Sequence, residues 1–199
     1  VEVYSGAQLG DDTTATEMVV AGQLEINNTS TAPLVGYVPE LGIFDIPFLF
    51  ADEAEADKVL ASEVGDYLNA KLADKGIINL AWNENGFREL TNSVREVKSV
   101  DDMKNLKVRV AGSNLLMECY KRWGADATNL NWSETYTALQ QNTVEGQENP
   151  LPAIDAASVQ EVQPYCSMWD AIYDCLFFCI NQDIYDGLTP EQQAVVDLS

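Results

Sequence analysis

Strand-like and helical segments alternate along this chain of 199 residues, and the alternation limits the fold more than any other feature. The segments with strand character are 1–5, 24–30, 77–82, 107–111, 127–130 and 173–181, and 87–93 is expected to be extended. The helices expected between them are 11–22, 53–75, 113–124, 132–142 and 151–161. Such alternation is typical of α/β proteins, in which helices cover the faces of a sheet.

The helix expected at 53–75 has the clearest pattern. Its apolar side chains recur every four positions, at Leu60, Val64, Leu68 and Leu72. That spacing places them on one face, which we expect to pack onto the core. The segment 144–150, in contrast, is expected to be a tight turn from a strand into a loop.

Two sequence signals mark helix starts. Ser99 with Asp102 predicts a capped short helix at 100–106, and Thr189 with Gln192 predicts a capping box at the start of a final helix. The chain stops about two turns later and opens on a strand-like segment without Met. We therefore expect segments to be missing at both ends, a cleaved targeting segment among them.

Acidic residues dominate the charge of the chain. It has 32 Asp and Glu, 11 Lys and Arg and no His, which gives a net charge of −21. Nucleic acids and anionic membranes attract clustered Lys and Arg, so neither is expected as a partner. No apolar run approaches the roughly 20 residues of a membrane-spanning helix, and no insertion into a membrane is expected.

Motifs for metals, cofactors and catalysis are absent from the sequence. The four cysteines form no CxxC pair and have no histidine to complete a zinc site, so we expect no metal, no cofactor, and free thiols or a single disulfide. The GxSxG, Walker and GxGxxG motifs are missing, as is histidine, the commonest general base. Glu145 and Glu148 could act as a carboxylate pair, and a hydrolase is the least favoured function.

Basic residues are concentrated in one short part of the chain. Six of the eleven lie there: Arg88, Arg95, Lys98, Lys104, Lys107 and Arg109. In the strand 107–111, alternation puts Val108 and Val110 on one face and Arg109 on the other. Two interpretations stay open. Either Arg109 points to water, or it lies at the carboxyl end of the strand, where open α/β sheets bind ligands, and holds a carboxylate with its planar fork.

Two other residues are also candidates for a pocket. Trp132, at the start of an expected helix, is suited to an apolar wall or to core packing. Asn149, next to a proline, is suited to bind a ligand as both donor and acceptor, or to shape a turn. The local pattern does not decide between these roles.

Six blocks, in this order and spacing, resemble the substrate-binding proteins of tripartite ATP-independent periplasmic (TRAP) transporters. They are "YSGAQLGDD" (4–12), "YVPELGIFDIPFLF" (37–50), "ENGFRELTNS" (84–93), "DDMKNLKVRV" (101–110), "WSETYTALQQNTVEGQENP" (132–150) and "EVQPY" (161–165). The resemblance implies an α/β fold of two lobes, incomplete at both ends here, joined by crossing strands and closing on the ligand like a flytrap. It places 1–84 mostly in lobe I and 85–175 mostly in lobe II, with 176–199 returning towards lobe I and starting a truncated helix.

The resemblance also implies ligand-binding residues. The arginine of the "KVRV" block, Arg109, is expected to form the salt bridge with the ligand carboxylate, and that of "GFR", Arg88, is expected to be a second anionic contact. Asn149 of "GQENP" and Trp132, before the "SETYTALQ" helix, are expected to line the site. The contacts implied from lobe I are Asp12, Thr29 and Ser30. The usual "RVP" is "RVAGSN" here, so the loop after Arg109 is expected to differ.

Members of this family bind small organic acids in the periplasm and deliver them to a sodium-driven permease. The resemblance therefore implies a periplasmic binding protein, not an enzyme, with a small organic acid and membrane permease subunits as partners. A sugar acid or uronate is favoured because Trp132 could stack on a sugar-like ring, and a C4-dicarboxylate or 2-oxo acid stays open. The alternative function is an extracytoplasmic ligand-sensing subunit for a signalling kinase.

Overall fold

The computed structural model describes residues 2–197 and confirms the α/β class. Six strands form one sheet within these residues: β1 (Ile26–Ser30), β2 (Ile77–Asn92), β3 (Lys107–Val110), β4 (Asp126–Asn129), β5 (Gly146–Pro150) and β6 (Tyr165–Asn181). Their order across the sheet is β1-β6-β2-β5-β3-β4. β3 pairs in parallel with β4 and β5, and the remaining pairs are antiparallel.

Helices fill most of the connections between the strands. The α-helices are α1 (Asp12–Val20), α2 (Glu53–Leu60), α3 (Glu63–Ala73), α4 (Asn114–Arg122), α5 (Trp132–Gln140), α6 (Leu151–Ala156), α7 (Gln182–Asp186) and α8 (Pro190–Asp197). Short 3₁₀ turns are η1 (Ala32–Leu34), η2 (Pro39–Asp45), η3 (Val100–Met103) and η4 (Val159–Glu161). No helix within residues 2–197 has the length and apolar character needed to span a bilayer.

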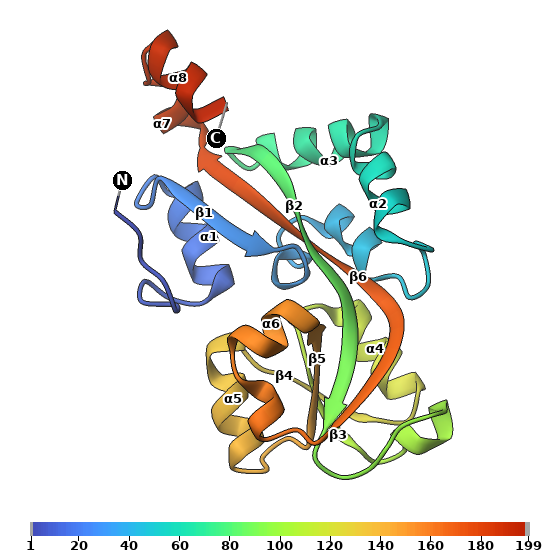
Figure 1. Cartoon of the computed structure of the whole chain (residues 1–199). Coiled ribbons are helices and arrows are strands. Elements are labelled where there is room, and N and C mark those ends of the chain that lie inside the picture. The colour runs from blue at the N-terminus through green and yellow to red at the C-terminus, as the bar shows by residue number, and fades with distance from the viewer. Residues whose placement is uncertain (1, 198–199) are drawn as a thin grey trace.

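Two long strands join the two halves of the molecule. β2 and β6 have 16 and 17 residues and pair antiparallel along most of their length. In Figure 1 they run from an upper half, with α1 to α3 and β1, to a lower half, with α4 to α6 and β3 to β5. The two-lobed fold with crossing strands is therefore confirmed.

Each half has its own apolar core. The upper core combines side chains from positions 19–77 with Tyr173, Cys175, Phe177 and Cys179 of β6. The cores of the lower half come from positions 90–172, apart from Ala32 of η1. The upper half is thus built from two separate stretches of sequence. The boundaries 1–84, 85–175 and 176–199 remain a prediction.

The prediction of a single helix at 53–75 is wrong, because the segment forms two helices, α2 and α3. Ser62 between them has an extended backbone, and its hydroxyl accepts a hydrogen bond from the Val64 amide at 3.2 Å. A serine cap of this kind starts a new helix rather than continuing the old one. The apolar stripe is interrupted as a result: Leu68 and Leu72 are buried, whereas Val64 is 37 % exposed.

The strand expected at 1–5 is also wrong for the residues that the structure describes, since 2–5 has no regular structure. Val1 lies outside the described residues. Val3 is 81 % exposed, and no described strand pairs with this segment. Strand propensity alone does not hold a strand in water without a neighbour to pair with.

Three further differences concern where the strands and helices begin and end. The separate segments expected at 77–82 and 87–93 form the single strand β2, because Gly86 (φ 107°) and three bulges allow it to bend. The turn expected at 144–150 contains the buried strand β5. The helix expected at 151–161 ends with α6, because Ser158 has a left-handed backbone (φ 54°). Both capping signals are confirmed, at η3 and at the start of α8, although η3 ends at Met103 and not at 106 as expected.

Candidate functional site

Arg109 lies in a strand that is covered on both faces. Its neighbours Val108 and Val110 are fully buried, as the alternation predicts, but Arg109 itself is only 4 % exposed. Its Nε donates a hydrogen bond to the Leu130 carbonyl at 2.9 Å, and its guanidinium carbon lies 5.5 Å from the centre of the Trp132 ring. The interpretation that Arg109 points to bulk water is therefore wrong.

A small cavity of about 80 Å³ opens beside Arg109. Its walls come from both halves of the molecule: Asp12, Thr13 and Pro33 above, and Arg109, Gly112, Asn129, Leu130, Asn131 and Trp132 below. Arg109 lies near the end of β3, Asn129 ends β4, and the other residues below follow these strands, so the cavity lies at the carboxyl ends of the two parallel strands. That is the edge where open α/β sheets bind ligands.

The guanidinium of Arg109 has donors to spare at this cavity. Among residues 2–197, neither terminal nitrogen donates a hydrogen bond, and the nearest carboxylate oxygen, Oε1 of Glu148, is 3.9 Å from Nη1. Burial lowers the pKa of Arg109 to about 10, so the side chain is still a cation at neutral pH. A buried cation with free donors beside a cavity is suited to bind an anion.

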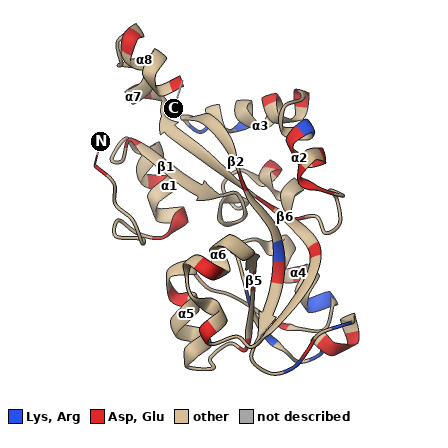
Figure 2. Ribbon diagram, in the orientation of Figure 1, with Lys and Arg blue, Asp and Glu red and all other residues tan. Residues whose placement is uncertain are grey.

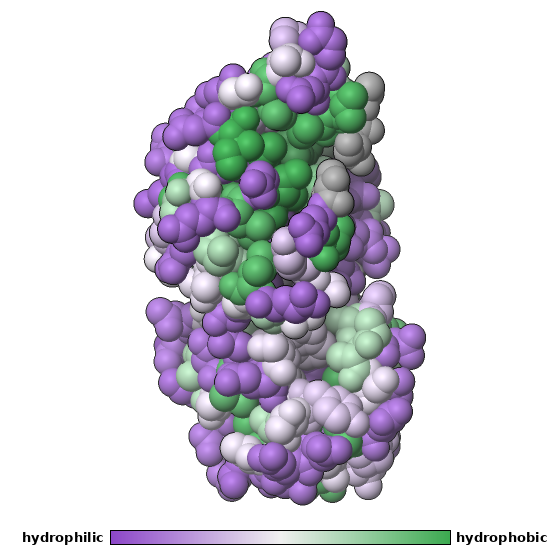
Figure 3. All heavy atoms as spheres, turned by 90° about the vertical axis from the view of Figure 1, so that its left-hand side faces the viewer, coloured by the Kyte–Doolittle hydropathy of each residue, from purple (hydrophilic) through white to green (hydrophobic). Residues whose placement is uncertain are grey.

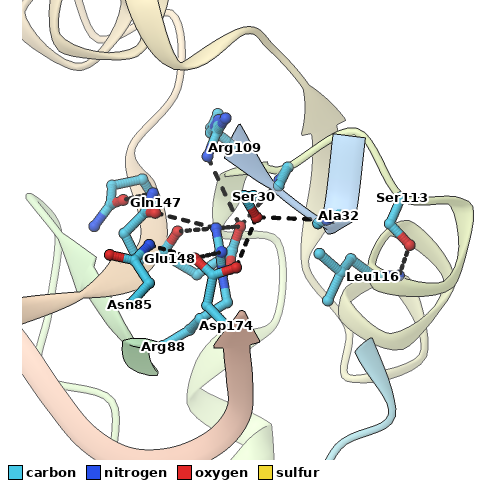
Figure 4. Close-up of polar contacts among 12 residues, drawn as sticks. Ser30, Ala32, Asn85, Arg88, Arg109, Ser113, Leu116, Gln147, Glu148 and Asp174 are labelled. Atoms are coloured by element: carbon cyan, nitrogen blue, oxygen red, sulfur yellow. Dashed lines mark hydrogen bonds and ion pairs between the residues drawn. The ribbon is translucent and has the colours of Figure 1, made fainter. Parts of the chain in front are cut away.

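Arg88, in contrast, has a protein partner at each of its three guanidinium nitrogens. It lies on β2, is 3 % exposed, and ion-pairs through Nε with Glu148 and through Nη1 with Asp174 at 2.6 Å. Its Nη2 donates to Oε1 of Glu148 at 3.2 Å and to Oδ1 of Asn149 at 3.1 Å. Burial alone lowers the pKa of Arg88, but the two carboxylates outweigh it and raise the pKa. Figure 4 shows this arginine enclosed by its partners.

Asn149 belongs to the same buried cluster. Its Oδ1 accepts from Arg88, its Nδ2 donates to Oε1 of Gln147 at 2.9 Å, and it is 6 % exposed. Gln147 in turn donates to the Thr91 hydroxyl on β2 at 2.8 Å. The amide of Asn149 is thus held within the sheet by β2 and β5.

The three residues expected from lobe I lie at the ends of α1 and β1. Asp12 opens α1, accepts a hydrogen bond from the Thr29 hydroxyl at 2.9 Å, and lines the cavity beside Arg109. Ser30 ends β1 and donates to Oδ1 of Asp174 at 2.7 Å, which joins it to the cluster around Arg88. The structure therefore brings Asp12, Arg109 and Trp132 to one cavity and places Ser30 with Arg88.

Two carboxylates of this cluster were missed by sequence reasoning. Glu148 was considered only as one of a carboxylate pair in a turn, and Asp174 was not singled out. Asp174 stands alone in the apolar run 173–181, and a carboxylate in a buried strand almost always has a partner. That isolated charge was the signal that could have identified it.

A larger cavity of about 820 Å³ shares Asp12 and Trp132 with the small one. Its lining includes apolar side chains of β1, β6 and the preceding loop, namely Leu24, Ile26 and Phe178, and polar ones, namely Asn27, Asn28, Ser133 and Tyr136. Figure 3 shows a broad apolar surface on the upper half of this side of the molecule. A volume sufficient for a small molecule therefore lies next to the small cavity, with Asp12 and Trp132 lining both.

Charges of both signs lie close together where the two halves meet. Figure 2 shows acidic residues spread over both halves and a basic segment of β2 where the halves meet. No group of three or more side chains suited to bind a metal is found within residues 2–197. The four cysteines are free thiols, Cys175 and Cys179 being buried. The feature of the site that is suited to an organic anion is the guanidinium of Arg109, with its unused terminal nitrogens.

The sequence matches the family model described as bacterial extracellular solute-binding protein, family 7, over residues 1–198. It is 36 % identical to the 2,3-diketo-L-gulonate-binding periplasmic protein of Escherichia coli, covering 98 % of this chain and 60 % of that protein.

Two solved structures have the same fold. The sugar acid binding protein of Advenella mimigardefordensis, in complex with galactonate, is 38 % identical with a TM-score of 0.94, covering 96 % of this chain and 62 % of that one. A TRAP periplasmic solute-binding protein of Polaromonas, bound to D-erythronate, is 39 % identical with a TM-score of 0.93, covering 96 % and 63 %. The chain thus spans about three fifths of the length of these relatives. By the family match and these relatives, it belongs to the bacterial extracellular solute-binding proteins of family 7, the TRAP family that its sequence blocks resemble.

Proposed function

We propose that this chain is the ligand-binding part of a periplasmic receptor that captures a sugar acid through Arg109 and delivers it to a sodium-driven TRAP permease. The observation that supports this most directly is the state of Arg109, a buried cation with unused donors at a cavity between the two halves. A planar guanidinium can hold both oxygens of a carboxylate, and in a dry cleft such a pair is stronger than in water.

The shape of the cavities supports a ligand with a carboxylate at one end and hydroxyl groups along its length. The small cavity beside Arg109 has room for a carboxylate, and Trp132 forms one of its walls. The larger cavity offers amides and hydroxyls at Asn27, Asn28 and Ser133, which are suited to bind sugar hydroxyls. The relatives that bind 2,3-diketo-L-gulonate, galactonate and D-erythronate favour the same class of ligand.

Substitution of Arg109 tests this proposal. In titration calorimetry with galactonate, we expect Arg109→Ala to weaken binding by about 2–4 kcal/mol, because a buried charge pair loses one partner. Arg109→Lys keeps the charge but loses the planar fork, so we expect a smaller loss. Lys107→Ala is the matched control, since Lys107 lies on the same strand but is exposed. Equal affinities of wild type and Arg109→Ala would contradict the carboxylate-binding role.

We propose delivery to a permease rather than a signalling role because solved relatives are named TRAP periplasmic solute-binding proteins. The test is uptake of radiolabelled galactonate in cells that carry the permease subunits, with and without this protein. Uptake that does not depend on the protein would contradict delivery, whatever the calorimetry shows.

A further inference from the structure

Glu148 lies between the two arginines of the site. Its Oε2 pairs with Nε of Arg88, and its Oε1 accepts from Nη2 of Arg88 at 3.2 Å and from the Ala111 amide at 3.0 Å. The same Oε1 lies 3.9 Å from Nη1 of Arg109. Glu148 is fully buried, and both arginines are nearly so. One carboxylate is therefore shared unequally, with Arg88 in close contact and Arg109 just beyond hydrogen-bonding range (Figure 4).

The unequal sharing matters because an unpaired buried carboxylate would draw Arg109 away from the cavity. Attraction between opposite charges is much stronger in a buried site than in water. Arg109 needs to move by only about 1 Å to form a full ion pair with Glu148, given the 3.9 Å separation and an ordinary N–O distance near 2.9 Å. In that position its donors would be occupied before a ligand arrived. Arg88 prevents this by occupying both oxygens of Glu148.

The charges of the cluster balance only when Arg88 is present. Arg88 and Arg109 carry two positive charges, and Glu148 and Asp174 carry two negative ones. Asp174 is held in place by Ser30 at 2.7 Å and by Asn85 at 2.6 Å. Without Arg88, the cluster would carry a net charge of −1 next to the cavity and would repel an anionic ligand.

We propose that Arg88 is a positioning residue: by neutralising Glu148 it leaves Arg109 free for the ligand carboxylate. This inference rests on the proposed function, because it takes Arg109 as the carboxylate-binding group. It differs from the sequence expectation that Arg88 touches the ligand, since the three guanidinium nitrogens of Arg88 are all engaged by protein groups.

A second-site rescue separates the two roles. We expect Arg88→Met to weaken binding of galactonate roughly tenfold to a hundredfold, because Glu148 then captures Arg109. The double variant Arg88→Met/Glu148→Gln removes the competing carboxylate and restores the charge balance, so we expect it to recover at least tenfold of that loss. A direct contact between Arg88 and the ligand predicts that most of the loss remains, because Glu148→Gln does not restore that contact. Arg95→Met is the control for loss of an arginine, since within residues 2–197 the hydrogen bonds of its guanidinium go to the carbonyls of Asp102 and Lys104.

The test is done in the full chain by calorimetry at pH 7.5, with circular dichroism and melting curves to verify folding. If Arg88→Met does not fold, Arg88→Lys replaces it. Lysine still neutralises Glu148, so positioning predicts an affinity within about threefold of wild type, whereas loss of a bidentate ligand contact predicts a decrease of tenfold or more.

The result for wild type separates this inference from the proposed function. Wild type that binds neither galactonate nor D-galacturonate would overturn the proposed function, and this inference with it. Wild type that binds while the double variant stays as weak as Arg88→Met would overturn this inference alone.

Discussion

We expect the buried carboxyl group of Asp45 to make the free energy of unfolding depend on pH. It ends η2, is 3 % exposed, and its Oδ2 has no hydrogen-bond partner among the described residues. Burial raises the pKa of Asp45 from 3.8 to about 7, although a hydrogen bond with Ser113 and the charge of Arg88 oppose the increase. The folded protein therefore holds a proton on this carboxyl at pH values where the unfolded chain has lost it.

The free energy of unfolding changes with pH according to the difference in bound protons between the unfolded and folded states. Between pH 3.8 and about 7 the unfolded state binds fewer protons at Asp45, so the free energy of unfolding decreases as the pH rises and levels off above pH 7. Each pH unit in this range costs about 1.4 kcal/mol. From pH 5 to pH 8 the contribution of Asp45 therefore falls by about 2.5 kcal/mol.

Asp45→Asn removes the titration and keeps the shape of the side chain. Urea unfolding of wild type and variant at pH 5 and pH 8 gives four free energies of unfolding. We expect the variant to gain about 2.5 kcal/mol relative to wild type between the two pH values. Other groups that titrate in this range, such as Glu89 with a pKa raised by burial to about 6, cancel because both proteins contain them. Asp101→Asn, at an exposed position, is the control and should follow wild type.

The reasoning is refuted if the stability difference between wild type and Asp45→Asn is the same at pH 5 and pH 8. That result would mean that Asp45 is ionised in the folded protein across this range. A gain at pH 8 that also occurs in Asp101→Asn would instead reflect the general relief of negative charge.

Two other predictions concern the upper core and its thiols. Leu72→Ala should lower the free energy of unfolding by about 2–5 kcal/mol, because Leu72 is fully buried. Val64→Ala should lower it by less than about 1 kcal/mol, because Val64 lies at the surface. Equal losses in urea unfolding would contradict the two-helix arrangement. Iodoacetamide should label the exposed Cys166 of the folded protein well before Cys175 and Cys179, which are buried and whose pKa values are raised by burial. If mass spectrometry detects early modification of either buried thiol, the upper core opens readily.

Local signals predicted much of the fold. The capping boxes of Ser99 with Asp102 and of Thr189 with Gln192 formed where the sequence placed them, because a cap depends on residues only three positions apart. The same kind of signal was overlooked at Ser62, where a regular apolar stripe concealed a helix boundary. Periodicity therefore located the helical segment but not its interruption.

The candidate site was less accessible to local reasoning. Strand alternation correctly put Val108 and Val110 on one face, but it could not show that the other face of β3 is also covered. The partners of Arg88 lie 60 and 86 positions away, at Glu148 and Asp174, so no short pattern links them. The clustering of basic residues and the strand pattern made Arg109 a candidate but left its role open, and the family resemblance favoured a ligand contact for both arginines. Neither could show that only Arg109 has terminal nitrogens without a hydrogen-bond partner among residues 2–197.

The crossing strands also fix the order in which the protein can be completed on the ribosome. The cores of the lower half draw almost entirely on positions 90–172, so that half can be assembled as soon as it emerges. The upper core has to wait, because its apolar residues at 19–77 are covered by β6 only after Cys179 has been made, about 100 residues later. At about 5–20 residues per second, that is a delay of several seconds or more. During this interval the nascent upper half exposes the very surface on which a holding chaperone would act.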